Sequence, residues 1–143
     1  MTTMERRYLI FEIQGTRYAF DLAHISEVAD PPRSWPIPLA PACFTGAMHI
    51  HGSIIAAMDL ALFLGLPPCC KPEKVVILHQ SVAAMAFLVD TVIRIAHEKD
   101  VTICESSGAR FAPSILSLPE GEAMLLDVDL IIKAAENILI KRP

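Results

Sequence analysis

Apolar residues along this chain alternate with polar ones or form short unbroken runs. Residues 6–13, 18–22, 43–50 and 53–58 are runs of this kind, rich in β-branched and aromatic side chains and separated by turn-forming residues. Short strands that recur every roughly 8–12 residues are typical of small barrels and not of a parallel sheet. The pattern therefore predicts a mainly β protein.

The first half contains two predicted hairpins. QGTR, residues 14–17, joins the first two strands, and His51-Gly52 joins the third and fourth, with Gly52 supplying a positive φ. Between the hairpins, residues 23–28 predict one helical turn that leads into a strand. The proline-rich segment 29–42 predicts an ordered, extended loop, because proline lacks a backbone donor and cannot occupy a central strand.

The second half repeats this organisation. Residues 74–79 and 82–89 predict a hairpin turned by Gln80-Ser81, and residues 91–98 predict a strand that follows directly. Residues 115–140 predict a further hairpin, turned by PEGE, that runs into a terminal helix.

Each half ends in a strand, an aspartate and a leucine-rich helix. Asp59 is the expected N-cap of the first helix and Gly65 its stop, whereas Asp127 or Asp129 caps the second. This echo predicts two similar lobes within one domain, residues 1–143, with a boundary near residues 65–73 and with terminal segments that cross between the lobes.

Composition and charge narrow the range of possible functions. Apolar residues make up 53% of the chain, against about 45–50% in an average soluble domain, so we expect a partner to cover part of the apolar surface. The net charge is −4 and the 12 Lys and Arg residues are scattered, which argues against nucleic acid. No run approaches the roughly 18 apolar residues of a membrane span, so we expect no membrane insertion.

The N-terminal apolar run is too short for an export signal. It follows a twin arginine, but Glu12 and Arg17 interrupt it before it reaches the length of a signal-peptide core. We therefore expect a cytoplasmic protein.

Cysteines and histidines are the candidate metal or redox residues. The cysteines show no CxxC spacing, so we expect free thiols in a reducing compartment; they are Cys43, Cys69, Cys70 and Cys104. His49 and His51 share a face of the predicted strand and could form half of a metal site. The other histidines lie at unpatterned spacings, so we expect no bound metal.

No catalytic motif is present. The chain lacks GxSxG, P-loop, GxGxxG and HExxH patterns. The aspartates that follow or interrupt apolar runs are better explained as caps than as acid–base pairs; they are Asp21, Asp59, Asp90 and Asp127. The sequence therefore argues against an enzyme.

The order of the segments nevertheless resembles a known family. QGTRYAFDLAHISEV, CFTGAMHIHGSIIAAMDLALFLGLP, VAAMAFLVDTV and LSLPEGEAMLLDVDLI together resemble the CheW family, the coupling proteins of bacterial chemotaxis-type signalling. The resemblance spans roughly residues 8–135.

The resemblance implies both a fold and a role. The implied fold is two SH3-like five-stranded β-barrels that share an apolar core, with short helices that include a C-terminal one. The implied role is a non-enzymatic adaptor without a cofactor, which links the cytoplasmic tips of methyl-accepting chemoreceptors to a CheA-type histidine kinase in membrane-associated arrays.

Five residues carry the implied partner surface. Ile25 and Glu27 match apolar and acidic positions that contact receptor in the family. Gly46 and Gly52 match the glycines of a segment usually written with Asn-Leu-Arg-Gly, and His51 stands where arginine is usual. Histidine is mostly neutral near pH 7 and reaches less far than arginine, so this departure predicts a changed contact or simple drift.

Two alternatives stay open. The first is a CheW-like module of a non-flagellar pathway with an altered partner surface. The second is a redox or metal sensor that uses Cys69, Cys70 and the pair His49 and His51.

Overall fold

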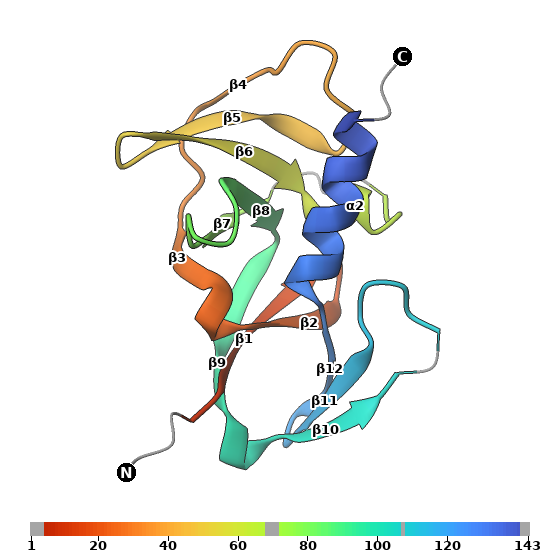
Figure 1. The fold of residues 1–143 in the computed structure, drawn as a ribbon. Helices are drawn as coiled ribbons and strands as arrows, with labels where there is room; N and C mark the ends of the chain where they lie inside the picture. The colour runs from red at the N-terminus through yellow and green to blue at the C-terminus, as the bar shows by residue number, and fades with distance from the viewer. Residues whose placement is uncertain (1–4, 68–71, 107, 141–143) are drawn as a thin grey trace.

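The computed structural model describes residues 5–67, 72–106 and 108–140. It is mainly β, as expected, and its strands form two six-stranded sheets (Figure 1). Sheet 1 consists of β1 (Arg7–Ile13), β2 (Thr16–Asp21), β9 (Thr91–His97), β10 (Thr102–Glu105), β11 (Ser114–Leu118) and β12 (Gly121–Leu125). Sheet 2 consists of β3 (Ile25–Ala29), β4 (Ser34–Trp35), β5 (Phe44–Ile50), β6 (Ser53–Asp59), β7 (Lys74–Leu78) and β8 (Met85–Val89).

Both sheets are curled, because strands that are consecutive in the chain occupy their opposite edges. The strand order is β10-β11-β12-β2-β1-β9 in sheet 1 and β3-β7-β8-β6-β5-β4 in sheet 2. A flat six-stranded sheet is about 24 Å wide, whereas the links 98–101 and 30–33 reach at most about 17 Å. Each sheet must therefore bend into a barrel, and sheet 1 forms a visible ring in Figure 1.

The strand count of each barrel differs from the expected five. In sheet 1, the short 3-10 helix η2 (Glu98–Asp100) separates β9 from β10 and so interrupts the strand that wraps from one edge of the sheet to the other. In sheet 2, residues 30–33 of the proline-rich loop make the same interruption. Each broken strand is counted twice, and this gives six strands per sheet.

The chain changes sheets at two points, neither of which lies near residues 65–73, where we expected the boundary. It passes from β2 to β3 through η1 (Leu22–His24) and from β8 to β9 at Asp90. Residues 65–67, 72 and 73 lie between elements of sheet 2. The N-terminal hairpin completes a sheet made otherwise of C-terminal strands, through the parallel pair β2–β12.

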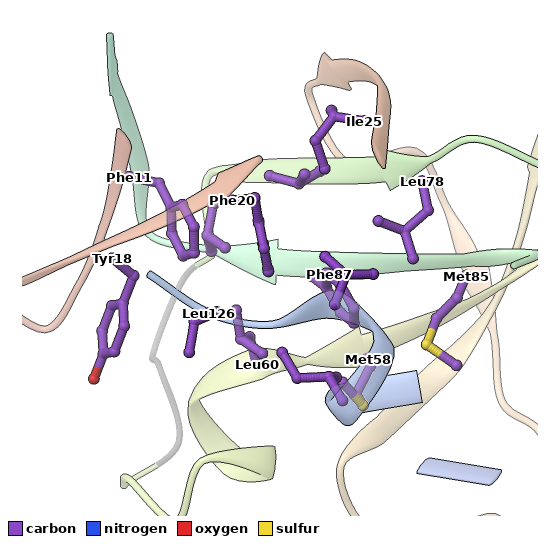
Figure 2. Packing of buried hydrophobic residues seen from close by; sticks show 14 of the residues in the cluster. Phe11, Tyr18, Phe20, Ile25, Met58, Leu60, Leu78, Met85, Phe87 and Leu126 are labelled. Carbon is purple, nitrogen blue, oxygen red and sulfur yellow. The ribbon is translucent and has the colours of Figure 1, made fainter. Parts of the chain in front are cut away.

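A single apolar cluster lies between the two sheets. Phe11 and Phe20 from sheet 1 stack at 4.9 Å between ring centroids, and Phe87 of sheet 2 stacks on Phe20 at 5.4 Å (Figure 2). Ile131 and Ala135 of α2 (Val128–Ile140) are buried in the same cluster. The two barrels and the C-terminal helix therefore share one core, while a smaller cluster fills the inside of each barrel.

The aspartates act locally, as the sequence predicted for most of them. Asp59 caps α1 (Leu60–Phe63) by accepting a hydrogen bond from the Ala61 N–H at 3.0 Å. Asp127, and not Asp129, caps α2, accepting from the Leu130 N–H at 3.2 Å. Asp21 caps η1 and Asp90 accepts from the Gln14 N–H in the β1–β2 turn; their bonds measure 3.0 and 2.7 Å.

Two local features differ from the sequence predictions. β10 was not predicted, because all four of its residues are exposed and lack an alternating apolar face. The β7–β8 connection spans residues 79–84 and not a two-residue turn, since Val82 and Ala83 donate to the carbonyl of His79 and close a longer loop.

Candidate protein-interaction site

The structure brings Glu27 and His51 together, although 24 positions separate them in the chain. Nε2 of His51 lies 3.1 Å from each carboxylate oxygen of Glu27. Glu27 belongs to β3 and His51 to the β5–β6 turn, and these elements meet because sheet 2 is curled. The side chains are 37% and 78% exposed, respectively, so a partner can contact both.

The turn that carries His51 has the geometry expected from its sequence. His51 and Gly52 have φ values of 49° and 81°, and Ile50 pairs with Ser53 across them. Two central residues with positive φ define the type I′ turn that suits a two-residue hairpin. Histidine is one of the few residues other than glycine that are enriched at positive φ, so the backbone tolerates it there.

The charge of this pair depends on the protonation state of His51. Neutral imidazole donates one hydrogen bond from Nε2–H and leaves Glu27 with a net charge of −1 on the surface. Protonated imidazole forms an ion pair with Glu27 and brings the net charge of the two side chains to zero. Arginine at this position would keep the pair neutral at every pH near 7.

A cavity of about 430 Å³ lies beside the pair. We call it the hairpin cavity: Glu27 and His51 line one side, and the β7–β8 loop lines another with His79 and Gln80. Nε2 of Gln80 donates to the Ser53 hydroxyl at 2.6 Å and ties that loop to the β5–β6 hairpin. The result is a polar rim over the apolar interior of sheet 2.

Two of the five candidate residues are buried and structural. Ile25 is 6% exposed and packs in the shared core. Gly46 is buried in β5, where an added Cβ would lie 2.9 Å from the carbonyl carbon of Trp35 and closer still to its oxygen. Gly46 therefore lets the proline-rich loop approach the sheet, while the exposed part of the candidate surface is Glu27, His51 and Gly52.

The sequence did not single out other exposed residues on the same sheet. Trp35 is 50% exposed on β4, with the Arg33 guanidinium 5.8 Å from its ring centroid, and Ile54 is 73% exposed on β6. His79 and Gln80 join the site only through the fold. The single sequence feature that could have pointed to this additional surface was a tryptophan inside a proline-rich loop.

The metal and redox candidates do not form a cluster in the part of the chain that the structure describes. His49 is exposed on β5 and His51 is bonded to Glu27. Within residues 5–67, 72–106 and 108–140, no three residues among His, Cys, Asp and Glu gather in an arrangement that could hold a metal ion. Cys43 and Cys104 are free thiols, and Cys69 and Cys70 lie outside the described residues.

Comparison with known proteins identifies the family to which this architecture belongs. The family model of the CheW-like domain matches residues 7–136. The chain belongs to the CheW-like family. Chemotaxis protein CheW of Thermotoga maritima is 25% identical over 142 residues, which cover 96% of this chain and 92% of the relative.

A solved structure supports the fold. The crystal structure of scaffolding protein TtCheW from Thermoanaerobacter tengcongensis superposes with a TM-score of 0.75 at 18% identity. The match covers 87% of this chain and 90% of that one. In this CheW-like chain, no helix among the described residues is long and apolar enough to cross a membrane.

Proposed function

We propose that this CheW-like protein is a non-enzymatic adaptor that couples the cytoplasmic tips of methyl-accepting chemoreceptors to a CheA-type histidine kinase. Family membership supports this role, and so do the names of the related proteins, a chemotaxis protein and a scaffolding protein. An adaptor in a receptor array acts in the cytoplasm, beside the membrane and without inserting into it.

The observation that carries the proposal is the exposed pair formed by Glu27 and His51 at the rim of the hairpin cavity. A bonded acid–base pair on a curled sheet presents polar groups in a fixed position without the need to order a loop. Pre-organised polar groups around an apolar recess suit a protein partner, because less conformational entropy is lost when the partner binds.

The test reconstitutes signalling from purified protein, receptor-containing membranes and the histidine kinase of the same organism. Wild-type protein should raise kinase autophosphorylation above the level of kinase and membranes alone. Glu27→Lys should abolish most of this increase. Glu122→Lys makes the same charge change at an exposed position of β12 in sheet 1 and should leave the increase intact.

Two results would contradict the proposal. One is the absence of any effect of wild-type protein on the kinase. The other is an equal loss in both charge variants, which would point to net charge and not to this site. Melting temperatures within about 2 °C of wild type establish that both variants are folded.

His51 favours a second candidate, a CheW-like module of a non-flagellar pathway with an altered partner surface. Histidine in place of the arginine usual in the family removes a permanent positive charge beside Glu27. In a reconstituted system, kinases and receptors from the two kinds of pathway can be compared directly. Stronger activation with the components of the non-flagellar pathway would identify it as the partner system.

A further inference from the structure

A second cavity, of about 350 Å³, lies at the end of sheet 1 where α2 begins. We call it the helix-end cavity. Tyr8 of β1, His24 of η1 and Ile103 of β10 line it together with the first residues of α2. It lies on the other barrel from the hairpin cavity and shares no lining residue with it.

The two buried polar side-chain atoms that lack a hydrogen-bond partner within the described residues both belong to residues that line this cavity. They are the hydroxyl oxygen of Tyr8 and Nδ1 of His24. Tyr8 is 1% exposed. Buried polar groups almost always find partners because leaving one unpaired is costly, so two such atoms at one cavity indicate a missing polar group.

The helix-end cavity itself has room for that group, and Tyr8 is the large polar member of the small cluster inside sheet 1. Ile103, on the edge strand, is 47% exposed and can move aside to admit a ligand. The described volume accommodates a group of about eight heavy atoms with space to spare.

The charges around the cavity select a cation. Asp21, Asp127 and Asp129 line it against one guanidinium, that of Arg6. Asp21 and Asp127 use Oδ1 for their helix caps, which leaves Oδ2 for a ligand. Neutral imidazole and a phenol oxygen both accept hydrogen bonds, so every polar side chain here except Arg6 can accept from a donor-rich cation.

We infer that the helix-end cavity binds an ammonium or guanidinium group on a short aliphatic chain. The cationic head donates to Tyr8, His24 and the aspartates, and the chain packs against Ile103 and the apolar start of α2. Such a group comes from a free amine or from a lysine or arginine side chain of a partner protein. This site is independent of the proposed function.

The experiment titrates the full chain with n-butylguanidinium and follows backbone amide shifts in ¹H–¹⁵N spectra. Saturable shifts should map to the residues around the cavity, with a dissociation constant on the order of 1 mM for a ligand of this size. The neutral isostere n-butylurea should produce no saturable shift. Arginine blocked at both ends as amides tests the second source: binding at least as tight identifies a protein side chain, and absence of binding identifies a free amine.

Three variants test the assignment of the residues. Tyr8→Phe should weaken n-butylguanidinium about fivefold or more. Because it removes a hydroxyl with no partner, it should leave the melting temperature unchanged or raise it. Asp129→Asn should weaken binding about threefold, while Glu122→Gln, a matched change on neighbouring β12, should leave it within twofold.

Three results would overturn the inference. They are equal binding of n-butylurea, no saturable shift up to about 20 mM ligand, and wild-type affinity in Tyr8→Phe. A Tyr8→Phe protein that melts well below wild type would also contradict it, since it would show that the hydroxyl already has a partner.

Discussion

Replacing Phe87 by alanine tests whether the two barrels depend on one core. Phe87 is completely buried on β8 of sheet 2 and stacks on Phe20 of sheet 1 at 5.4 Å. Phe→Ala changes in cores cost about 3–5 kcal/mol, and each kcal/mol lowers the melting temperature of a chain of this size by about 2–4 °C. We therefore expect Phe87→Ala to melt about 6–20 °C below wild type.

The aromatic residues of the chain report on the two sheets separately. Its one tryptophan, Trp35, lies on sheet 2, whereas its two tyrosines, Tyr8 and Tyr18, lie on sheet 1. Urea unfolding followed by tryptophan fluorescence and by second-derivative tyrosine absorbance therefore measures both barrels in one sample. With a shared core, both transitions should shift together and by the same free energy.

A tyrosine transition that stays at its wild-type midpoint while the tryptophan transition moves would refute the shared core. Ile54→Ala, on the same sheet but 73% exposed, is the control. It should change the free energy of unfolding by no more than about 0.5 kcal/mol.

Three further predictions concern single sites. His51→Arg should change stability by less than about 1 kcal/mol, measured by urea unfolding, because the pair is exposed. Gly46→Ala should destabilise the fold by about 1–3 kcal/mol in urea unfolding, since the new methyl group overlaps the Trp35 carbonyl. The hydrogen bond from Arg94 lowers the pKa of Glu120 to about 2, so this carboxylate stabilises the fold above its unfolded pKa, and unfolding at several pH values should show that stability falling as the pH drops from about 4.5 to 2.

Each of these has a contrary outcome. A change of more than about 1 kcal/mol in His51→Arg would show that the contact between Glu27 and His51 contributes more to stability than an exposed pair does. Unchanged unfolding of Gly46→Ala means that the proline-rich loop does not need its close approach to β5. In Glu120→Gln the part of the acid dependence that this carboxylate contributes should disappear, while the part from other carboxylates such as Asp30, whose pKa Lys74 lowers, remains. An unaltered pH profile would show that Arg94 and Glu120 do not stabilise the folded state as a pair.

The sequence predicted the structural features that depend on residues close together in the chain. The β1–β2 and β5–β6 hairpins, the caps at Asp59 and Asp127 and the loop before β5 all follow from turn chemistry and alternation over a few positions. Even the type of turn at His51 was predictable, because Gly52 follows it.

The features that the sequence did not predict are those that depend on contacts between distant segments. No local signal says that β2 pairs with β12 or that Glu27 meets His51, because both contacts arise from the curl of a whole sheet. Ile25 alternates with its neighbours like a half-buried strand residue, and only the assembled core shows that it faces inward. Gly46 resembled a binding residue for the same reason: the carbonyl that excludes a side chain there comes from Trp35.

The placement of the N-terminal hairpin in sheet 1 sets an order for folding on the ribosome. β1 and β2 emerge first, but the strands that flank them in the sheet, β9 and β12, are made only after all of sheet 2. Sheet 2, which is complete by β8, can close while the outer edges of the aromatic β1–β2 hairpin still lack their partner strands. Exposed apolar strand edges are prone to aggregate, so the nascent chain exposes its most vulnerable segment until β9 has been made.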